Sequence, residues 1–459
     1  MNFETASFRD PSGQIFLRDD KIFRSIYSDG VEDFEAARQN SIYEESIQNG
    51  YLIEHTEASL TSAPEGSIYC IEHPLIKMIT YPWEWSFSML KDAALLHLDM
   101  MDFLIPKGFW LRDANAFNVQ CHNGKLLLID TLSIGKRTEN SPWVAYNQFC
   151  SHFLAPLAVA AYSDIRTLGL WRANINGYPL DLAARLLPTL KKYSPGLLMH
   201  LTMHAHFQKK SQKRQNLKTK TTTRPRKFND LALSGLINSL RKTISKIKIN
   251  LKSEIWSEYD SIRTYQSDDV IIKTDFVRKI ISRLLPETVW DLGGNTGEFS
   301  MTAAQGGAFV MSIDGDPACT EFIYQKRRSQ KNGERILPIT MDLANPSPSL
   351  GWESEERKSL TARGPADLVL SLALIHHLVF SSNIPLNRIA KWFAAIGKYC
   401  IVEYMPLDDP MVKTLTENRT EHHPYSLEAF KSAFGIFFTE LESMQLNNNR
   451  ILFFFKRKN

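Results

Sequence analysis

The stretch VWDLGGNTGEFS, residues 289–300, decides the fold. An apolar run that ends in an acidic residue is typical of a buried strand, and the glycines after it predict a turn leading into a helix. A strand–turn–helix unit of this kind brings backbone amides against a bound nucleotide. The stretch therefore predicts a nucleotide-binding α/β domain, and the question is which nucleotide it takes.

Two nucleotide classes use such a glycine turn. The dinucleotide fingerprint GxGxxG sets a pyrophosphate on the helix N-terminus, but its third glycine position is occupied here by Glu298. A carboxylate in the first helical turn is a poor neighbour for a pyrophosphate. S-adenosylmethionine (SAM) carries an ammonium and a carboxylate instead, which suit an acidic residue beside exposed amides. The sequence favours SAM, and the expected contacts are Asp291, Gly293, Gly294, Asn295 and Gly297.

Seven apolar runs in the C-terminal half predict strands, and helical stretches separate most of them. The runs are 288–292, 309–313, 336–341, 367–372, 399–403, 437–441 and 451–456. Strands alternating with helices imply a parallel sheet with helices on both faces. The last two runs have no helix-length gap, so they predict an antiparallel hairpin. A Rossmann-like seven-stranded sheet with this ending is the plan of class I SAM-dependent methyltransferases, and DLGGNTGEFS resembles their motif I.

Polar residues at the ends of three later strands fit the same ligand. Asp314 ends the second strand, where a carboxylate accepts hydrogen bonds from ribose hydroxyls. Asp316, two residues further on, is the alternative. Asp342 follows the third strand, where the resemblance implies a contact with the adenine amino group. Ser371 ends the fourth strand, where it implies proximity to the methyl group.

Two adjacent histidines, His376 and His377, follow the fourth strand and are the candidate general bases. Methyl transfer is an in-line displacement in which the protein positions the acceptor and, for a hydroxyl or an amine, removes a proton. The alternative is that one histidine packs between helix and sheet or only walls the SAM pocket. No Asn/Asp-Pro-Pro-Tyr/Phe run follows the fourth strand, which disfavours amide or adenine amino-group methylation.

The N-terminal half contains a second pattern, GFWLRDANAFNVQCHNGKLLLIDTLS, at residues 108–133. It resembles the catalytic loop and metal-binding hairpin of protein kinases. The resemblance implies that Asp113 is a base and that Asn118 and Asp130 hold phosphate-bound Mg²⁺. The alternative is that these three side chains only stabilise a turn.

This sequence departs from the kinase pattern at several points. Leu111 stands where kinases have histidine, and Thr131-Leu132 replaces Phe-Gly. No glycine-rich loop and no obvious strand lysine precede the pattern, and Arg24 is a conceivable stand-in for that lysine. We therefore expect an α+β N-terminal domain with a degenerate kinase-like fold.

A basic run separates the two halves. Residues 209–227 contain nine Lys or Arg and no acid, so the net charge of +4 becomes −5 without them. The run has no aromatic residue for stacking on bases, which favours a solvated linker over a nucleic-acid site. The expected organisation is an N-terminal domain at 1–207, a linker at 208–230, a helical lead-in at 231–264 and a methyltransferase domain at 265–459.

As a whole, the chain resembles a bacterial family of SAM-dependent methyltransferases related to host-specificity nodulation proteins. The resemblance runs through FRDPSGQIF, YPWEWSFSMLKDAALL, LRDANAFNVQ, LLLIDTLS and DLGGNTGEFS. It implies methyl transfer to a small-molecule or glycan-type acceptor. The alternative is a bifunctional or regulatory protein whose N-terminal half binds Mg-nucleotide. Five scattered cysteines and no apolar run of about 18 residues suit a cytoplasmic protein without a membrane span.

Overall fold

The structure is a computed structural model that describes residues 2–207, 228–249, 251, 267–417 and 422–458. The chain divides into two compact units. Unit 1 comprises Met1–Asn250 and Leu350–Glu356, and unit 2 comprises Leu251–Ser349 and Arg357–Asn459. The predicted linker at 208–230 lies almost wholly outside the described residues.

Unit 1 begins with a five-stranded antiparallel sheet in the order β1-β2-β3-β5-β4. Its strands are β1 (Asn2–Phe3), β2 (Gly13–Arg18), β3 (Lys21–Ile26), β4 (Thr56–Glu57) and β5 (Tyr69–His73). Helices α1 (Ser28–Gln39) and α2 (Ile42–Gln48) connect β3 to β4. Phe16, Phe23 and Cys70 form a small buried cluster on this sheet. The predicted α+β character of the N-terminal half is present in this unit.

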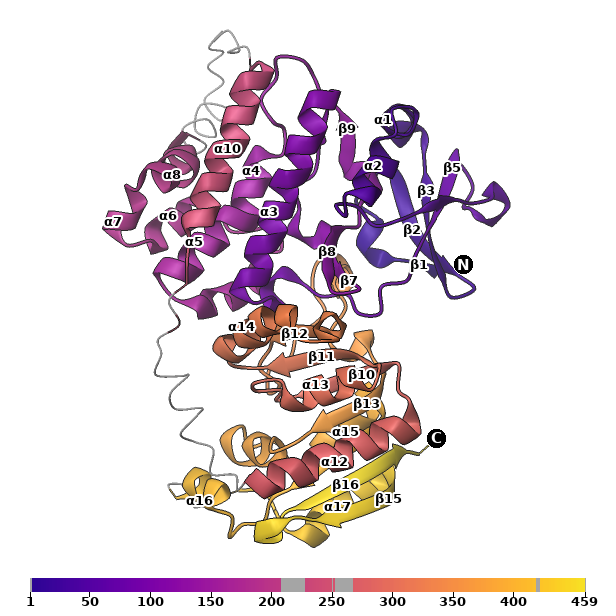
Figure 1. Ribbon diagram of the computed structural model, residues 1–459, viewed down its shortest axis with the longest axis vertical. Coiled ribbons are helices and arrows are strands. Elements are labelled where there is room, and N and C mark those ends of the chain that lie inside the picture. The colour runs from indigo at the N-terminus through magenta and orange to yellow at the C-terminus, as the bar shows by residue number, and fades with distance from the viewer. Residues whose placement is uncertain (1, 208–227, 250, 252–266, 418–421, 459) are drawn as a thin grey trace. The chain divides into compact units, whose positions relative to one another are not determined.

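The remainder of unit 1 is mainly helical, with two small sheets (Figure 1). The buried helix α3 (Phe87–Leu104) leads to β6 (Phe109–Leu111), which pairs with β9 (Ile134–Lys136). Between them, β7 (Val119–His122) and β8 (Lys125–Leu128) form the hairpin predicted around HNGK. The other helices are α4 (Tyr146–Phe149), α5 (Ala155–Tyr162), α6 (Leu180–Leu186), α7 (Thr189–Lys192), α8 (Pro195–Leu197) and α10 (Asp230–Lys246).

Helix α10 belongs to unit 1, whereas the sequence placed it in a lead-in to the C-terminal half. Its apolar residues Leu233, Ile237, Leu240 and Ile244 are buried. Arg241 forms ion pairs with Asp99 and Asp102 of α3. The amphipathic pattern predicts a helix correctly, but the pattern alone does not say which domain covers its apolar face.

Unit 2 contains the predicted seven-stranded sheet. Its order is β12-β11-β10-β13-β14-β16-β15. Strand β16 runs opposite to the other six strands of this sheet. The strands are β10 (Thr288–Leu292), β11 (Phe309–Asp314), β12 (Ile336–Thr340), β13 (Ala366–Ser371), β14 (Gly397–Tyr404), β15 (Phe438–Gln445) and β16 (Ile451–Arg457). All seven predicted strands and the terminal antiparallel hairpin are confirmed.

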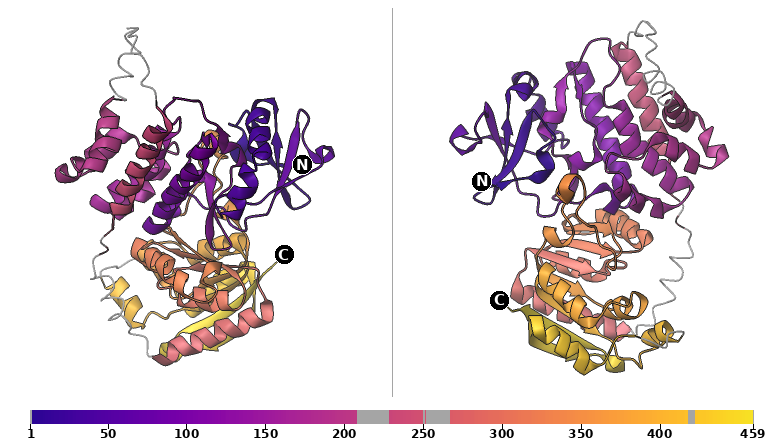
Figure 2. Two further views of the ribbon diagram at one scale, coloured as in Figure 1. Left: turned by 45° about the horizontal axis from the view of Figure 1, so that its top comes forward. Right: turned by 180° about the vertical axis from the view of Figure 1, so that it is seen from behind.

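Helices cover both faces of this sheet, as Figures 1 and 2 show. On one face, α12 (Ser267–Leu284) and α13 (Glu298–Gln305) pack on the central strands through a buried apolar cluster. On the other face lie α15 (Leu386–Ile396) and α17 (Leu427–Phe437), which meet through Phe393 and Phe434. Helix α14 (Pro317–Lys326) follows β11, and α16 (Pro410–Thr416) follows β14. The result is the three-layer α/β fold expected from the sequence.

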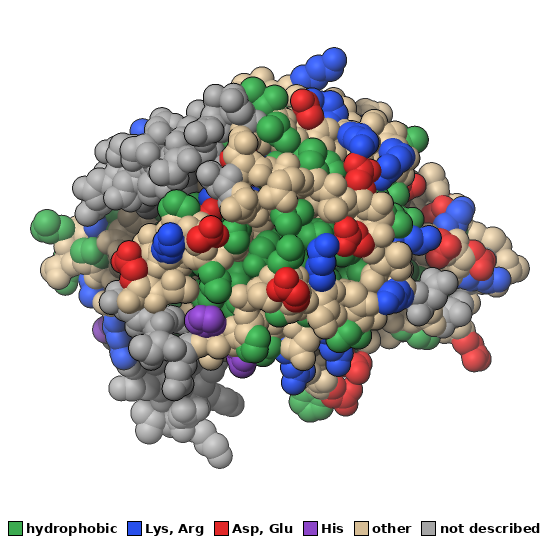
Figure 3. Space-filling model, turned by 90° about the horizontal axis from the view of Figure 1, so that it is seen from below, with side chains coloured by type: hydrophobic (Ala, Val, Ile, Leu, Met, Phe, Trp, Pro, Cys, Tyr) green, Lys and Arg blue, Asp and Glu red, His purple; other side chains and the backbone are tan. Residues whose placement is uncertain are grey.

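Strand β15 forms an edge of the sheet. Phe438 is the only buried residue of β15, and a bulge interrupts the register of the strand between Glu440 and Glu442. Charges and bulges at an edge discourage pairing with another chain. Figure 3, which views the molecule from below, shows acidic and basic side chains scattered among apolar ones. Among the described helices, none combines the length and the apolar character needed to cross a membrane.

Candidate functional site

The glycine turn lies where the chain reverses its direction across the sheet. From β10 the chain moves outward to β11 and β12, then returns to β13 on the other side of β10. Ligands of open α/β sheets bind at such a switch point, outside the carboxyl ends of the strands. Leu292 lies opposite Ile313 and Asp314 opposite Thr340. The predicted site residues therefore follow strands whose ends lie at one edge.

Backbone geometry explains why glycines occupy the turn. Gly293 and Gly297 adopt φ of 77° and 80°, a region that favours glycine. The amides of Gly293 and Gly294 both donate to the carbonyl of Ile313, at 2.8 and 2.9 Å. A Cβ on Gly294 would lie 2.2 Å from Ser312 Oγ. The turn is thus pressed against β11, and a side chain at Gly294 would displace it.

Asp291 lies beneath this turn and is 2% exposed. Its Oδ2 accepts a hydrogen bond of 2.5 Å from Ser300 Oγ, which also contacts Ser312 Oγ at 2.9 Å. Burial raises the pKa of Asp291 to about 6. The carboxyl group therefore links the end of β10 to helix α13, and its contact with SAM stays a prediction.

Asp314 is held by the backbone of two neighbouring turns. Its Oδ2 accepts from the amide of Asn295 at 2.8 Å, and its Oδ1 accepts from the amide of Asp316 at 2.9 Å. Burial raises the pKa of Asp314. Each carboxylate oxygen has a second lone pair, so these bonds leave capacity for ribose hydroxyls. Asp316 caps α14 through the amide of Ala318, and its contact with a ribose stays the alternative prediction.

Asp342 lies close to the end of β11, although it follows β12. A Cβ on Gly315 would be 3.8 Å from the Cα of Asp342. Asp342 is exposed, and its Oδ1 accepts from the amide of Ala344 at 2.9 Å. The structure therefore places the second-strand and third-strand carboxylates on adjacent turns.

The end of β13 and the segment after it carry three predicted residues. Ser371 is fully buried, and its hydroxyl has no hydrogen-bond partner among the described residues. His376 is 1% exposed, and its Nε2 likewise has none. His377 is exposed, and its ring lies 4.3 Å from that of His376. Leu374 comes close to the glycine turn, since a Cβ on Gly293 would lie 3.5 Å from its Cδ1.

The two histidines differ in protonation. Burial lowers the pKa of His376 to about 3, and the cations Arg450 and Lys273 and its neighbour His377 lower it further. Partial desolvation of its ring also lowers the pKa of His377. A base whose conjugate acid is this acidic removes a proton weakly at neutral pH. His376 is therefore suited to accept a hydrogen bond, and His377 is the better candidate for a base.

A buried ionic cluster adjoins His376. Lys273 Nζ of α12 lies 2.6 Å from Glu403 Oε1 at the end of β14, and both side chains are at most 2% exposed. Arg450 Nε, before β16, donates to Asp409 Oδ2 at 2.6 Å. Nothing in the sequence indicated that Arg450 and Asp409 join Lys273 and Glu403, because β16 had first to be placed beside β14.

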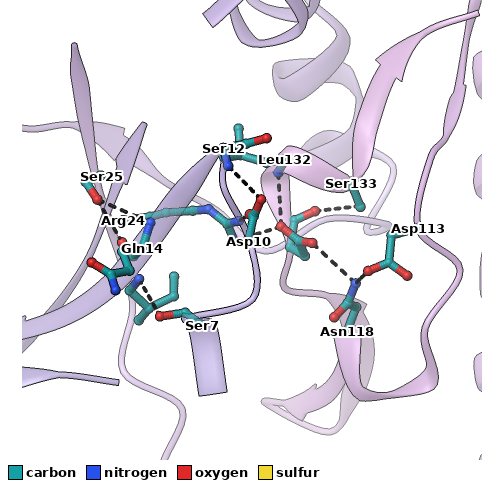
Figure 4. A network of polar contacts seen from close by, with 12 residues as sticks. Ser7, Asp10, Ser12, Gln14, Arg24, Ser25, Asp113, Asn118, Leu132 and Ser133 are labelled. Carbon is teal, nitrogen blue, oxygen red and sulfur yellow. Dashed lines mark hydrogen bonds and ion pairs between the residues drawn. The ribbon is translucent and has the colours of Figure 1, made fainter. Parts of the chain in front are cut away.

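In unit 1, the residues of the kinase-like pattern come together (Figure 4). Asn118 Nδ2 donates to Asp113 Oδ2 at 3.1 Å and to Asp130 Oδ2 at 3.3 Å. Burial raises the pKa of Asp113 to about 6, and the nearby charge of Asp130 raises it further. The turn interpretation is also met in part, since Asp130 Oδ1 accepts from the amide of Leu132.

Arg24 completes this constellation from strand β3. Its Nη1 lies 2.7 Å from Asp130 Oδ1, and its Nη2 contacts Asp10. The guanidinium of Arg24 is thus ion-paired with Asp130, the carboxylate predicted to bind Mg²⁺. Within the described residues, no group of three or more His, Cys, Asp or Glu side chains is arranged to hold a metal ion. Metal binding by Asn118 and Asp130 stays a prediction.

The chain is similar to one curated protein over nearly its whole length. It is 35% identical to nodulation protein NoeA of Rhizobium meliloti (strain 1021) over 433 residues, which cover 93% of this chain and 90% of that protein. No family model matches the chain. The sequence-based resemblance to nodulation proteins is thereby confirmed.

Similarity to solved structures is weaker. WbdD matches 43% of this chain and 42% of its own, at 16% identity and a TM-score of 0.31. The match to N-methyltransferase NodS from Bradyrhizobium japonicum WM9 covers 42% of this chain and 99% of NodS, at 11% identity and a TM-score of 0.32. The match to magnesium protoporphyrin IX methyltransferase ChlM from Synechocystis PCC 6803, with bound SAH, covers 44% of this chain and 95% of ChlM, at 17% identity and a TM-score of 0.31. This chain thus spans less than half the length of WbdD. The fold assignment rests on the strand order of unit 2.

Proposed function

The chain belongs to the family of nodulation protein NoeA, and we propose that it is a SAM-dependent methyltransferase acting on a small-molecule or glycan-type acceptor. The glycine turn at the switch point carries this proposal. Glu298 begins α13 directly after the turn, so a carboxylate occupies the position that a dinucleotide pyrophosphate would need. SAM supplies an electrophilic methyl group when bound.

The residues of unit 2 fit such a ligand. The turn of Gly293, Gly294 and Asn295 follows β10, with its three amides bonded to Ile313 and Asp314. Asp314 supports this turn and retains lone pairs for a ribose. Asp342 lies on the next turn, where an adenine amino group would need an acceptor. Ser371 ends β13 and the two histidines follow it, in the segment whose Leu374 lies against the glycine turn.

Titration calorimetry of the full chain with SAM and with S-adenosylhomocysteine tests the proposal. Asp314→Ala should weaken binding by about 1–3 kcal/mol, or roughly 5-fold to 150-fold, because ribose hydroxyls lose their acceptor. Asp367→Asn is the matched control, since Asp367 bonds Lys398 and Thr288 near the start of β13, at the opposite edge. Absence of binding, or equal binding by both variants, would exclude a SAM site at this turn.

The acceptor is the part of the function that the site describes least. We propose that unit 1 selects it and that the reaction takes place in the cytoplasm. All five cysteines are buried free thiols, which suits a reducing compartment. Transfer of labelled methyl from SAM into a cell extract, followed by fractionation, would identify the acceptor.

A second candidate function concerns unit 1. The contacts among Asp113, Asn118 and Asp130 favour a kinase-like site that holds a nucleotide with Mg²⁺. Arg24 on β3 supplies a cation where kinases use a strand lysine. The same arginine competes with Mg²⁺ for Asp130, so the site would bind the metal only if this ion pair is shared or broken.

Thermal unfolding with and without Mg-ATP tests this second function. A rise in Tm that Asp130→Asn abolishes would support nucleotide binding by unit 1. ATP with a chelator serves as the control for the metal. An unchanged Tm would leave the methyltransferase as the sole function of the chain.

A further inference from the structure

The buried ionic cluster beside His376 gathers charged side chains from separate parts of unit 2. Lys273 lies in α12 and Glu403 in β14. Asp409 is the N-cap residue of α16, and Arg450 lies in the turn before β16. All four are at most 6% exposed. Burying charges is unfavourable unless they are paired, and apolar residues of similar volume often stabilise a fold at least as well. The cluster therefore suggests a role beyond stability.

Both cations of the cluster have acidic partners. Lys273 is paired with Glu403 at 2.6 Å, and Arg450 with Asp409 at 2.6 Å. Arg450 also lies 3.8 Å from Glu403. A third acid, Asp269 of α12, is 2% exposed, and its Oδ1 accepts a hydrogen bond from the side-chain Nδ2 of Asn447 at 2.7 Å. With every group ionised, the cluster has no excess positive charge, and it disfavours an anion beside it.

None of the nearby buried polar atoms that lack a hydrogen-bond partner among the described residues belongs to a cation. They are the hydroxyl of Ser371, Nε2 of His376 and the carboxylate oxygens of Glu403, of which Oε1 forms the ion pair with Lys273. Lys273 and Arg450 both lower the pKa of His376, so the ring stays uncharged at neutral pH. Buried polar groups are nearly always hydrogen-bonded. A neutral hydroxyl and a neutral imidazole suit a ligand group that carries no charge.

From this arrangement we infer that the methyl acceptor presents an uncharged oxygen or nitrogen to the site, not a phosphate or a carboxylate. The inference rests on the proposed methyltransferase function. In it, His376 accepts a hydrogen bond from the acceptor, and the four charged residues act as positioning residues that hold the surrounding turns. Phosphates and carboxylates are excluded because no cation of the cluster is left to neutralise them.

The double variant Lys273→Met/Glu403→Met tests this inference, because it removes one charge of each sign. If the pair only positions the site, the variant should still transfer labelled methyl from SAM to a cell extract, within about 10-fold of wild type. If Lys273 instead binds an anionic acceptor, transfer should be lost. Lys279→Met is the matched control, since Lys279 lies on the same helix but pairs with Glu442 at the surface.

Binding of S-adenosylhomocysteine and cooperative unfolding show whether each variant keeps its fold. Where the double variant fails to fold, carbon-13 NMR of the wild-type product decides instead. A methyl group coupled to phosphorus, or one released as methanol by mild alkali, would overturn the inference. A methyl ether or N-methyl product supports it. If the wild type neither binds S-adenosylhomocysteine nor transfers label, the proposed function fails and the inference with it, an outcome distinct from a charged product.

Discussion

Nη1 of Arg24 lies 2.7 Å from Oδ1 of Asp130, and their side chains are 6% and 18% exposed. The contact joins the N-terminal sheet to the turn after β8. Asp10 binds the other arm of the same guanidinium. Arg24 therefore connects two parts of unit 1 that are about a hundred residues apart in sequence.

Arg24→Met should strongly destabilise unit 1. Removing the cation leaves Asp130 as a poorly compensated charge, which for buried pairs costs about 3–5 kcal/mol; the partial exposure of Asp130 places the expected loss at the lower end. Urea unfolding followed by circular dichroism measures it. Arg185→Gln, which breaks an exposed pair with Asp181, should have no measurable effect. Equal losses for the two variants would show that the buried pair has no special weight.

Asp291 should make stability depend on pH. Its pKa is about 6 in the fold against an ordinary 3.8, so the folded protein binds the proton more tightly than the unfolded chain. Its contribution is present below about pH 4 and is lost as pH rises through about 6. At about 1.4 kcal/mol per pKa unit, this amounts to on the order of 3 kcal/mol. Asp291→Asn should remove this loss between pH 4 and 7.

Asp367→Asn provides the opposite sign. The pKa of Asp367 is lowered overall, against its burial, by Lys398 and Thr288. The stabilisation by Asp367 is therefore present above about pH 4 and is lost in acid. At neutral pH, Asp367→Asn should have a lower free energy of unfolding than wild type. Parallel pH profiles for wild type and Asp291→Asn would contradict the raised pKa.

Gly294→Ala should disrupt the turn. The new Cβ would lie 2.2 Å from Ser312 Oγ, so either the turn must shift or Ser312 Oγ must rotate out of its contact with Ser300, at a cost of about 1–3 kcal/mol. We expect binding of S-adenosylhomocysteine to fall sharply in calorimetry. Gly435→Ala in α17 is the control, because nothing lies within 4 Å of its Cβ, and a helical glycine-to-alanine change stabilises by up to about 1 kcal/mol. Unaltered ligand binding by Gly294→Ala would remove this turn from the site.

His377→Ala should slow methyl transfer into the extract by about 100-fold or more if His377 is the general base. Wild-type transfer should then fall in acid below a pKa that burial has moved under 6.5. His376→Gln should slow transfer less and should not remove that acid limb, because His376 is already neutral there. Equal rates for wild type and His377→Ala would leave the chemistry without a histidine base.

The sheet of unit 2 could be predicted because each strand has a local signal. Seven apolar runs, separated by helices and ending in polar residues, indicate a parallel sheet whatever their partners are. The site follows from the same pattern, since the carboxyl ends of parallel strands lie on one side of the sheet. His376 and His377 were predicted together, and one of them was expected to pack inside as an alternative. Which of the two is buried could not be predicted, because neighbours in sequence face different surroundings only once the turn is folded.

Pairings between distant segments could not be predicted. The partners of Arg450 depend on β16 lying between β14 and β15, and the partner of Arg24 depends on a sheet and a hairpin meeting. Helix α10 shows the same limit, since its apolar face fits any apolar surface. In each case the sequence shows which group needs a partner without showing where that partner lies.

The segment Leu350–Glu356 has a consequence for the order in which the protein is made. It belongs to unit 1, where Arg9 Nε donates to Glu356 Oε1 at 2.8 Å and Thr5 Oγ1 to the carbonyl of Glu355 at 2.6 Å. Domains generally fold in the order of their synthesis. Here Thr5 and Arg9 cannot form these contacts until β10, β11 and β12 of unit 2 have been translated, because Glu355 and Glu356 follow those strands in the chain. Unit 1 therefore cannot be produced whole as a continuous fragment without part of unit 2, whereas a fragment that spans unit 2 carries Leu350–Glu356 without its unit 1 partners.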